Sequence, residues 1–271
     1  MTAVIDTPVT TPPAVAGARR TVSRVPLGRL VGVELRKMFD TRAGFWLMAS
    51  IGIANLLATA SVIAFAPEKA QTYDSFAAAI GFPMAVILPM VAVLAVTGEF
   101  SQRTGLTTFT LVPHRGRVLV AKALASLTVA VVSMLLAFAV GALGNLVGTA
   151  ISGAGTVWDI SFLHAVYIVL GNVVGLTLGF TLGLVIRNSP GAIVGYFVIS
   201  LVLPTVLSLL AGLQSWFKDL QPWVDLNYAQ GALFNGTMTS TAWAHLAVTG
   251  LLWLVVPIVV GVRMVLRSEI K

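Results

Sequence analysis

The stretch "FAAAIGFPMAVILPMVAVLAVT", residues 76–97, contains no charged residue over its whole length. A helix of about 20 apolar residues is long enough to cross the hydrocarbon core of a bilayer. A strand of a membrane β-barrel would instead alternate in polarity over about ten residues. The stretch is continuously apolar, so it predicts a membrane-spanning helix.

Five further apolar runs lie along the chain, at residues 44–66, 119–145, 163–186, 190–213 and 242–262. The 271 residues have a mean hydropathy of +0.93, and only 10% of them are charged. Soluble domains carry about 25% charged residues, so a soluble fold is excluded. The fold class that we predict is an all-α membrane protein with six transmembrane helices.

The basic residues are distributed unevenly around these runs. If the N-terminus is cytoplasmic, only Lys69 and Lys218 lie in outer loops, and the other 15 of the 17 basic residues lie on the inner side. Cytoplasmic loops are enriched in Lys and Arg. We therefore expect a multi-pass protein of the cell membrane with both termini in the cytoplasm. This distribution accounts for the net charge of +7 without a nucleic acid partner.

The first 25 residues are rich in Thr, Ala, Val and Pro, which predicts a disordered cytoplasmic tail before a transmembrane domain at 26–271. The segment "LGRLVGVELRKMFDTR", residues 27–42, is different, because it has the pattern of an amphipathic helix. Its apolar side comprises Leu27, Val31, Leu35, Met38 and Phe39, and its basic side holds Arg29, Arg36 and Lys37. Val33 and Glu34 break this pattern. We expect the helix to lie in the membrane interface, with a solvated helix as the alternative.

The segment from Gln214 to Ala242 is the longest outer connection. It is unusually apolar for a loop and holds Trp216, Phe217, Trp223, Tyr228 and Phe234. Aromatic side chains favour the membrane interface. Short interfacial or re-entrant helices before the sixth span are the natural prediction.

Several kinds of chemistry are absent from the sequence. There is no cysteine, no phosphate-binding G-x-x-x-x-G-K-[ST] loop, and neither an H-E-x-x-H nor a G-x-S-x-G motif. We therefore predict no catalytic residue, no metal site and no cofactor in this chain. The spans also lack an acidic or basic residue at mid-depth, which argues against ion-driven transport and intramembrane catalysis.

The charged segment "GEFSQRTGLTTFTLVPHRGRVLVAK", Gly98–Lys122, separates the second and third runs. The order of the predicted elements resembles that of the permease subunit of type-2 ATP-binding cassette (ABC) exporters. This order is an interfacial helix, two spans, a charged hairpin and four more spans, with an apolar outer loop before the last span. "ELRKMFDTRAGFWLM", Glu34–Met48, is similar to the elbow helix of that family. Glu99, Pro113, Arg117 and Lys122 match the hairpin pattern. Arg103-Thr104, followed by Gly105, stands where the family commonly has Gly-Thr.

The resemblance implies that the hairpin is a coupling helix that docks on a separate ATP-binding subunit, which binds ATP and Mg. Leu106 and Phe109 lie three residues apart on one helical face and are the expected apolar anchors. The basic residues expected to flank them are Arg103, Arg115 and Arg117. Glu99 has three open interpretations: a pair with Arg103, a contact with a basic group of the partner, or a cap of the hairpin.

In the family, two permease copies meet across a pathway lined mainly by the first, second and fifth spans. The corresponding candidates here are Asn55, Phe82, Met90, Tyr196 and Phe197. Plain packing remains the alternative for each of them. The resemblance implies ATP-driven export of an apolar or amphipathic substrate by a homodimer or heterodimer. The alternatives are a membrane scaffold or immunity-type protein that binds an ATPase without transport, and an intramembrane enzyme.

Overall fold

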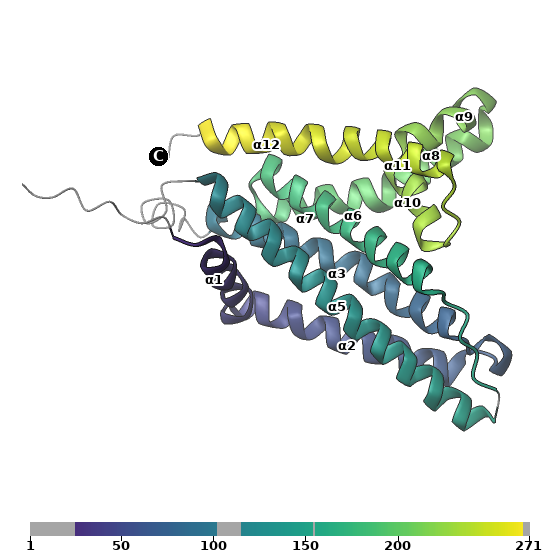
Figure 1. Ribbon diagram of the computed structural model, residues 1–271. Helices are drawn as coiled ribbons and strands as arrows, with labels where there is room; N and C mark the ends of the chain where they lie inside the picture. The colour runs from purple at the N-terminus through teal and green to yellow at the C-terminus, as the bar shows by residue number, and fades with distance from the viewer. Residues whose placement is uncertain (1–24, 102–114, 154, 268–271) are drawn as a thin grey trace, which may run out of the picture.

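A computed structural model describes residues 25–101, 115–153 and 155–267 of the chain. These residues are helical almost throughout, and the long helices lie side by side in one bundle (Figure 1). Six helical stretches are long and apolar enough to cross a membrane. They are α2 (Arg42–Phe65), α3 (Tyr73–Ser101), α5 (Arg115–Ser152), α6 (Phe162–Ile186), α7–α8 (Ser189–Leu213) and α11–α12 (Ser240–Arg267). Each coincides with one of the six apolar runs, so the predicted fold class is confirmed.

The shorter helices lie at the two ends of this bundle (Figure 1). The amphipathic segment forms α1 (Leu27–Asp40) at the end where α12 finishes, and a 3₁₀ turn, Glu68–Ala70, follows α2. At the opposite end lie α9 (Ser215–Val224) and α10 (Leu226–Phe234). The predicted outer segment is therefore a pair of short helices, which we call the outer hairpin, Ser215–Phe234.

The helix α5 is the longest in the described part of the chain. It has 38 residues, which at 1.5 Å per residue is about 57 Å, well beyond the roughly 30 Å of a hydrocarbon core. The apolar run at 119–145 therefore covers only its middle. Arg115 and Arg117 lie in its first turn, before the apolar run, at the end of the bundle where α1 lies.

The centre of the bundle is the contact between α3 and α6. An added Cβ at Gly179 of α6 would lie 2.5 Å from the carbonyl oxygen of Pro89 in α3, and one at Gly183 would lie 3.1 Å from Cβ of Val96. Small residues at these positions let the two backbones approach closely. On the α3 side the buried core includes Met84 and Leu88.

The fifth and sixth spans each contain a five-residue π-helical turn. These turns are Val198–Val202, between α7 and α8, and Leu251–Val255, between α11 and α12. A proline follows each turn after one intervening residue, Pro204 in the fifth span and Pro257 in the sixth. Proline lacks an amide hydrogen and its ring crowds the preceding turn, which explains the local widening of the helix.

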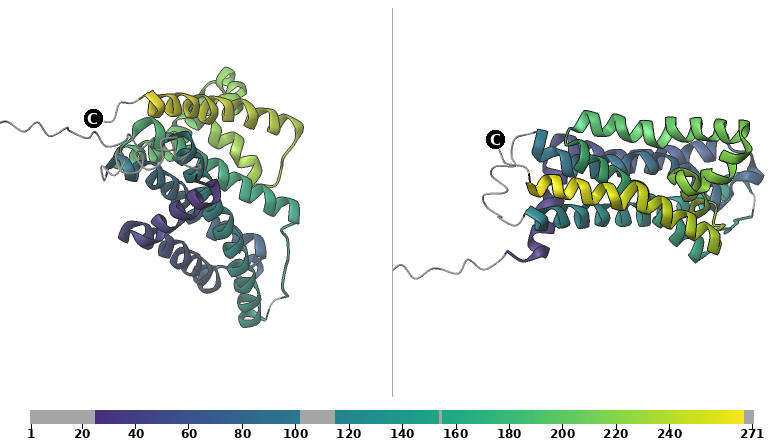
Figure 2. Two further views of the ribbon diagram at one scale, coloured as in Figure 1. Left: turned by 60° about the vertical axis from the view of Figure 1, so that its left-hand side comes forward. Right: turned by 90° about the horizontal axis from the view of Figure 1, so that it is seen from above.

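One face of the amphipathic helix α1 packs against protein, although only Glu34 and Met38 of the helix are fully buried. Its apolar side chains Val31, Leu35 and Met38 join a cluster with Val91 of α3 and Ala125 of α5. Phe39, which the sequence placed on the same side, is 53% exposed. The apolar face of α1 thus packs largely on α5 and α2, with Val91 of α3 beside them, and Figure 2 shows α1 lying across the end of the bundle.

Candidate functional site

Two regions of the bundle hold several of the residues that the sequence singled out. The first is the end where α1 meets the first turns of α5. The second is an apolar cluster where the second, fourth and fifth spans meet the outer hairpin.

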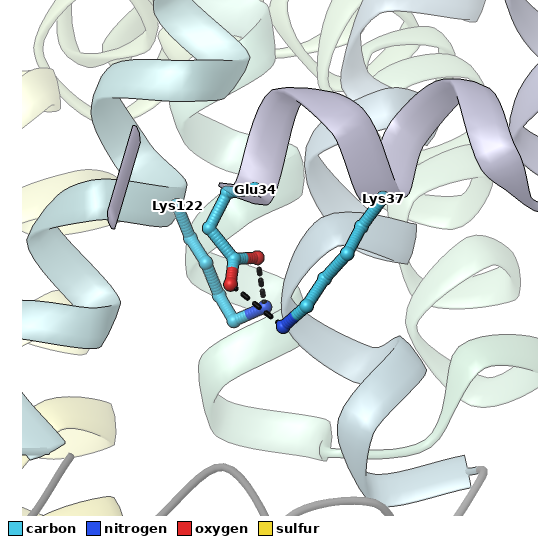
Figure 3. A network of polar contacts seen from close by, with 3 residues as sticks. All are labelled: Glu34, Lys37 and Lys122. Atoms are coloured by element: carbon cyan, nitrogen blue, oxygen red, sulfur yellow. Dashed lines mark hydrogen bonds and ion pairs between the residues drawn. The ribbon is translucent and has the colours of Figure 1, made fainter. Parts of the chain in front are cut away.

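At the first region, a buried ion pair joins α1 to α5 (Figure 3). Nζ of Lys122 lies 2.6 Å from Oε2 of Glu34, and both side chains are more than 90% buried. Lys37, one turn after Glu34, lies 2.8 Å from its other carboxylate oxygen but is 44% exposed. Removing one partner from a buried pair leaves an uncompensated charge, so this contact fixes α1 on α5.

The ion pair explains the irregularity of the amphipathic pattern. Glu34 interrupts the apolar face because it points toward Lys122, between helices, rather than toward water. Arg29 and Arg36 are exposed on α1, as a contact with lipid headgroups requires. The membrane-interface role of Arg29, Arg36 and Lys37 stays a prediction.

The predicted coupling hairpin, Gly98–Lys122, overlaps the helices α3 and α5 at its two ends. Its first residues belong to α3, which ends at Ser101, and its last belong to α5, which begins at Arg115. The segment between them, with Arg103, Leu106 and Phe109, lies outside the described residues.

The structure describes three further residues of this hairpin, two of them by their backbone alone. Glu99 and Arg115 are described only as backbone near helix ends. Arg117 donates from Nη2 to the carbonyl oxygen of Val25 at 2.8 Å, which connects the start of α5 to the chain two residues before α1. The docking role of all these residues stays a prediction.

The second region is an apolar cluster that we call the central cluster. Its buried members are Met90, Val93, Leu178, Ala192, Tyr196 and Leu226. Phe197 is half-buried against it, with Trp253 of the sixth span and Leu47 of the first. Three of the five predicted pathway residues, Met90, Tyr196 and Phe197, are therefore brought together.

Tyr196 is the polar member of the central cluster. Its hydroxyl donates to the carbonyl oxygen of Ala85 in α3 at 2.7 Å, and its ring contacts that of Phe197 edge to face. The carbonyl of Ala85 lies four residues before Pro89, which has no amide hydrogen to offer it. The tyrosine hydroxyl thus supplies a hydrogen bond that the α3 backbone lacks.

The other two predicted pathway residues lie elsewhere. Phe82 is 75% exposed on α3. Asn55 of α2 is buried, and its Oδ1 has no hydrogen-bond partner among the described residues. One turn further along α2, Thr59 packs against Gly144 of α5, where an added Cβ would collide with the Thr59 methyl group. Neither Phe82 nor Asn55 belongs to the central cluster, and their pathway role stays a prediction.

The sequence did not place Leu226 or Asp225 in the site. Both were assigned to an outer loop, but they are buried at the turn between α9 and α10. Asp225 is the N-cap of α10, where its Oδ1 accepts from the amides of Asn227 and Tyr228. An Asp before an apolar helical segment is a known N-cap signal, and it could have located the start of α10.

Six long apolar helices, a buried ion pair at one end and a short helical hairpin at the other define a multi-pass helical membrane protein. A family model described as "ABC-2 family transporter protein" matches residues 39–270. The chain belongs to this family, which confirms the resemblance drawn from the sequence. A comparison with curated proteins gives no match.

Membership in the ABC-2 transporter family determines the general function of the chain. The chain is the membrane permease subunit of an ABC transporter, a multi-pass membrane protein that works with an ABC ATP-binding partner.

Proposed function

We propose that the chain exports an apolar or amphipathic substrate, using ATP hydrolysed on a separate subunit that docks on the hairpin Gly98–Lys122. The two termini and this segment are cytoplasmic in the proposal. Fifteen of the 17 basic residues then face the cytoplasm, which supports this orientation.

The observation that carries the proposal is the composition of the central cluster. Its buried members are apolar except for the tyrosine hydroxyl, and they come from three different spans and the outer hairpin. Ligand sites are mostly apolar and aromatic with a few polar groups, so such a cluster suits an apolar substrate better than an ion. Separation of the spans around Met90 and Tyr196 would create the binding surface.

A second permease copy completes the proposed pathway. In an apolar 18-residue stretch of the fifth span only 6% of the residues are buried inside one chain, against 56% in the corresponding stretch of α6, so much of its surface is available to lipid or to another subunit. Whether the second copy is identical or related, the pathway lies between the two copies in this proposal.

Reconstitution with the ATPase subunit tests the proposal. In proteoliposomes, apolar compounds should stimulate ATP hydrolysis, and Met90→Ala with Tyr196→Phe should change the concentration that gives half-maximal stimulation. The matched control is Met264→Ala, at an exposed position on α12. ATP hydrolysis that no apolar compound alters, with the complex intact, would favour the non-transporting scaffold instead.

A further inference from the structure

Gly175 of α6 is the point at which three other segments meet. The atoms nearest to the position of its missing Cβ are Nε2 of Gln230 in α10 and the hydroxyl oxygen of Tyr196 in α7, both at 3.7 Å, and Cγ of Pro89 in α3 at 3.8 Å. Gly175 lies near the middle of the fourth span, Phe162–Ile186. Two polar side chains from different segments therefore meet at one glycine in the middle of a span.

Packing does not explain the glycine at position 175, although it explains the glycines one turn before and one turn after it. An added Cβ at Gly171 would lie 2.9 Å from the ring of Phe234, and one at Gly179 would lie 2.5 Å from the carbonyl oxygen of Pro89. At Gly175 the nearest atoms are at ordinary van der Waals distance, so an alanine would fit. Glycine in a helix interior costs conformational freedom. What its presence provides here is that no methyl group covers the two polar side chains.

Both polar groups keep hydrogen-bonding capacity beyond the bonds that they form. The hydroxyl of Tyr196 donates to the carbonyl oxygen of Ala85, and its own oxygen keeps lone pairs that can accept. Nε2 of Gln230 carries two hydrogens and has one acceptor among the described residues, the carbonyl oxygen of Gly171 at 2.7 Å. The two side chains thus offer one further donor and one further acceptor beside Gly175.

The surroundings of these two side chains are apolar. Tyr196 belongs to the central cluster, together with Met90 of α3 and Leu178, which lies three residues after Gly175 on α6. Tyr196 and Gln230 are only 5% and 9% exposed. A charged ligand group would lose its hydration here, and the atoms nearest to Gly175 carry no opposite charge. An uncharged polar group therefore suits this position.

We propose that Gln230, Tyr196 and Gly175 form a polar recognition point for the substrate, which takes an uncharged group that both donates and accepts hydrogen bonds. A hydroxyl or an amide on an otherwise apolar molecule is such a group. It accepts from the second hydrogen on Nε2 of Gln230 and donates to the hydroxyl oxygen of Tyr196. This inference rests on the proposed function, because it places the substrate in the central cluster once the spans separate.

Gln230 is then a specificity-determining residue of the pathway. A site that is built to hydrogen-bond one group of a substrate rejects analogues that lack this group, because its own buried polar groups are left unpaired. Methylation of a substrate hydroxyl removes the hydrogen that Tyr196 would accept. The added methyl group would also occupy the position beside Gly175. An alcohol and its methyl ether should therefore differ clearly as substrates.

Matched pairs of compounds test the recognition point in proteoliposomes that contain the permease and its ATPase subunit. Each pair is an apolar alcohol and its methyl ether, and the pairs cover a range of sizes. The measured quantity is the concentration that gives half-maximal stimulation of ATP hydrolysis. Gln230→Leu removes the donor, and Gly175→Ala covers both polar groups with a methyl group that the packing tolerates. The controls are Gln214→Leu, at an exposed position between α8 and α9, and Gly250→Ala, where an added methyl group meets no atom within 4 Å.

The alcohol of a pair should act at a concentration at least about tenfold lower than its methyl ether, which is the factor that a lost hydrogen bond in a buried site typically produces. Gln230→Leu and Gly175→Ala should each reduce this preference below about threefold, the latter with an unchanged melting temperature, and both controls should keep it. Equal action of alcohol and ether on the unsubstituted chain, or a preference that survives both variants, overturns the recognition point but leaves export of apolar compounds intact. No stimulation by any compound, with the complex intact, overturns the proposed function itself and the recognition point with it.

Discussion

Lys122 of α5 and Glu34 of α1 form an ion pair of 2.6 Å in which both side chains are buried. The pair connects the only described helix that lies before the first span to the helix that follows the predicted docking segment. A movement of the start of α5, where the ATPase would act on it, must therefore displace α1 or break the pair. The contact therefore connects the start of α5, beside the predicted docking segment, to the first span, which follows α1 after the single non-helical residue Thr41.

Lys122→Met should destabilise the protein strongly. Glu34 would remain buried with Lys37 as its described partner, and breaking a buried pair typically costs about 3–5 kcal/mol. Thermal unfolding in detergent should show a large fall in melting temperature. The double variant Glu34→Leu with Lys122→Met should recover most of the loss, because an apolar pair leaves no unpaired charge.

Lys37→Met provides the control on the same carboxylate. Lys37 is 44% exposed, and pairs of exposed groups contribute about 0–1 kcal/mol, so its melting temperature should change little. Equal losses for Lys37→Met and Lys122→Met would show that burial of the Lys122 pair does not determine its contribution.

The sequence predicted the spans well and the charge contacts poorly, for a physical reason. Six apolar runs need only length and composition to be recognised. Glu34 could be identified as an irregularity of the amphipathic helix, but its partner is 88 residues away, and no local pattern connects the two. The same holds for Leu226, whose burial depends on how far the outer hairpin folds back among the spans.

Glycine at 179 should be required for the contact between α3 and α6. In Gly179→Ala the new methyl group would lie 2.5 Å from the Pro89 carbonyl oxygen, and backbone cannot move aside as a flexible side chain can. Overpacking of this kind costs about 1–3 kcal/mol. The melting temperature in detergent should fall accordingly.

Gly175→Ala, one turn earlier on α6, is the matched comparison. Its added methyl group would have its nearest neighbours at 3.7 Å, which is ordinary van der Waals contact, so stability should be unchanged or slightly raised. If both variants melt alike, the close approach of α6 to Pro89 does not limit packing.

Membrane orientation can be measured by labelling of single cysteines in the cysteine-free chain. Ser101→Cys, at the end of α3, should react with an impermeant thiol reagent only from the cytoplasmic side. Thr237→Cys, between α10 and α11, should react only from outside. These outcomes follow from the distribution of basic residues. The reverse pattern would invert the topology and place the predicted docking segment outside the cell.

The candidate site could be predicted only in part from the sequence. The family resemblance makes Met90, Tyr196 and Phe197 candidates because they lie on the second and fifth spans, and packing does bring them together. The resemblance makes Asn55 and Phe82 candidates in the same way. Their positions around their helices differ, however, so Asn55 lies in the contact between α2 and its neighbours and Phe82 lies on the exposed side of α3. A span that is apolar on all sides carries no amphipathic signal of which face is inward.

Docking of the ATPase provides the last prediction. Phe109→Ala, alone or with Leu106→Ala, should weaken binding of the ATPase subunit, because truncating an interface hot spot typically costs about 2 kcal/mol or more. That corresponds to about thirtyfold in affinity. The variant should still insert and keep its melting temperature, since neither residue belongs to a span. Phe45→Ala, the same change at an exposed position near the start of α2, is the control and should bind normally.

Affinity capture of the ATPase in detergent, read beside a melting curve of the permease, separates docking from folding at Phe109. Weakened capture with an unchanged melting curve supports docking at this position. Unchanged capture with a lowered melting temperature would mean that Phe109 packs within the membrane domain. The docking anchor would then have to lie among the charged residues of the segment, with Arg103 the first to substitute.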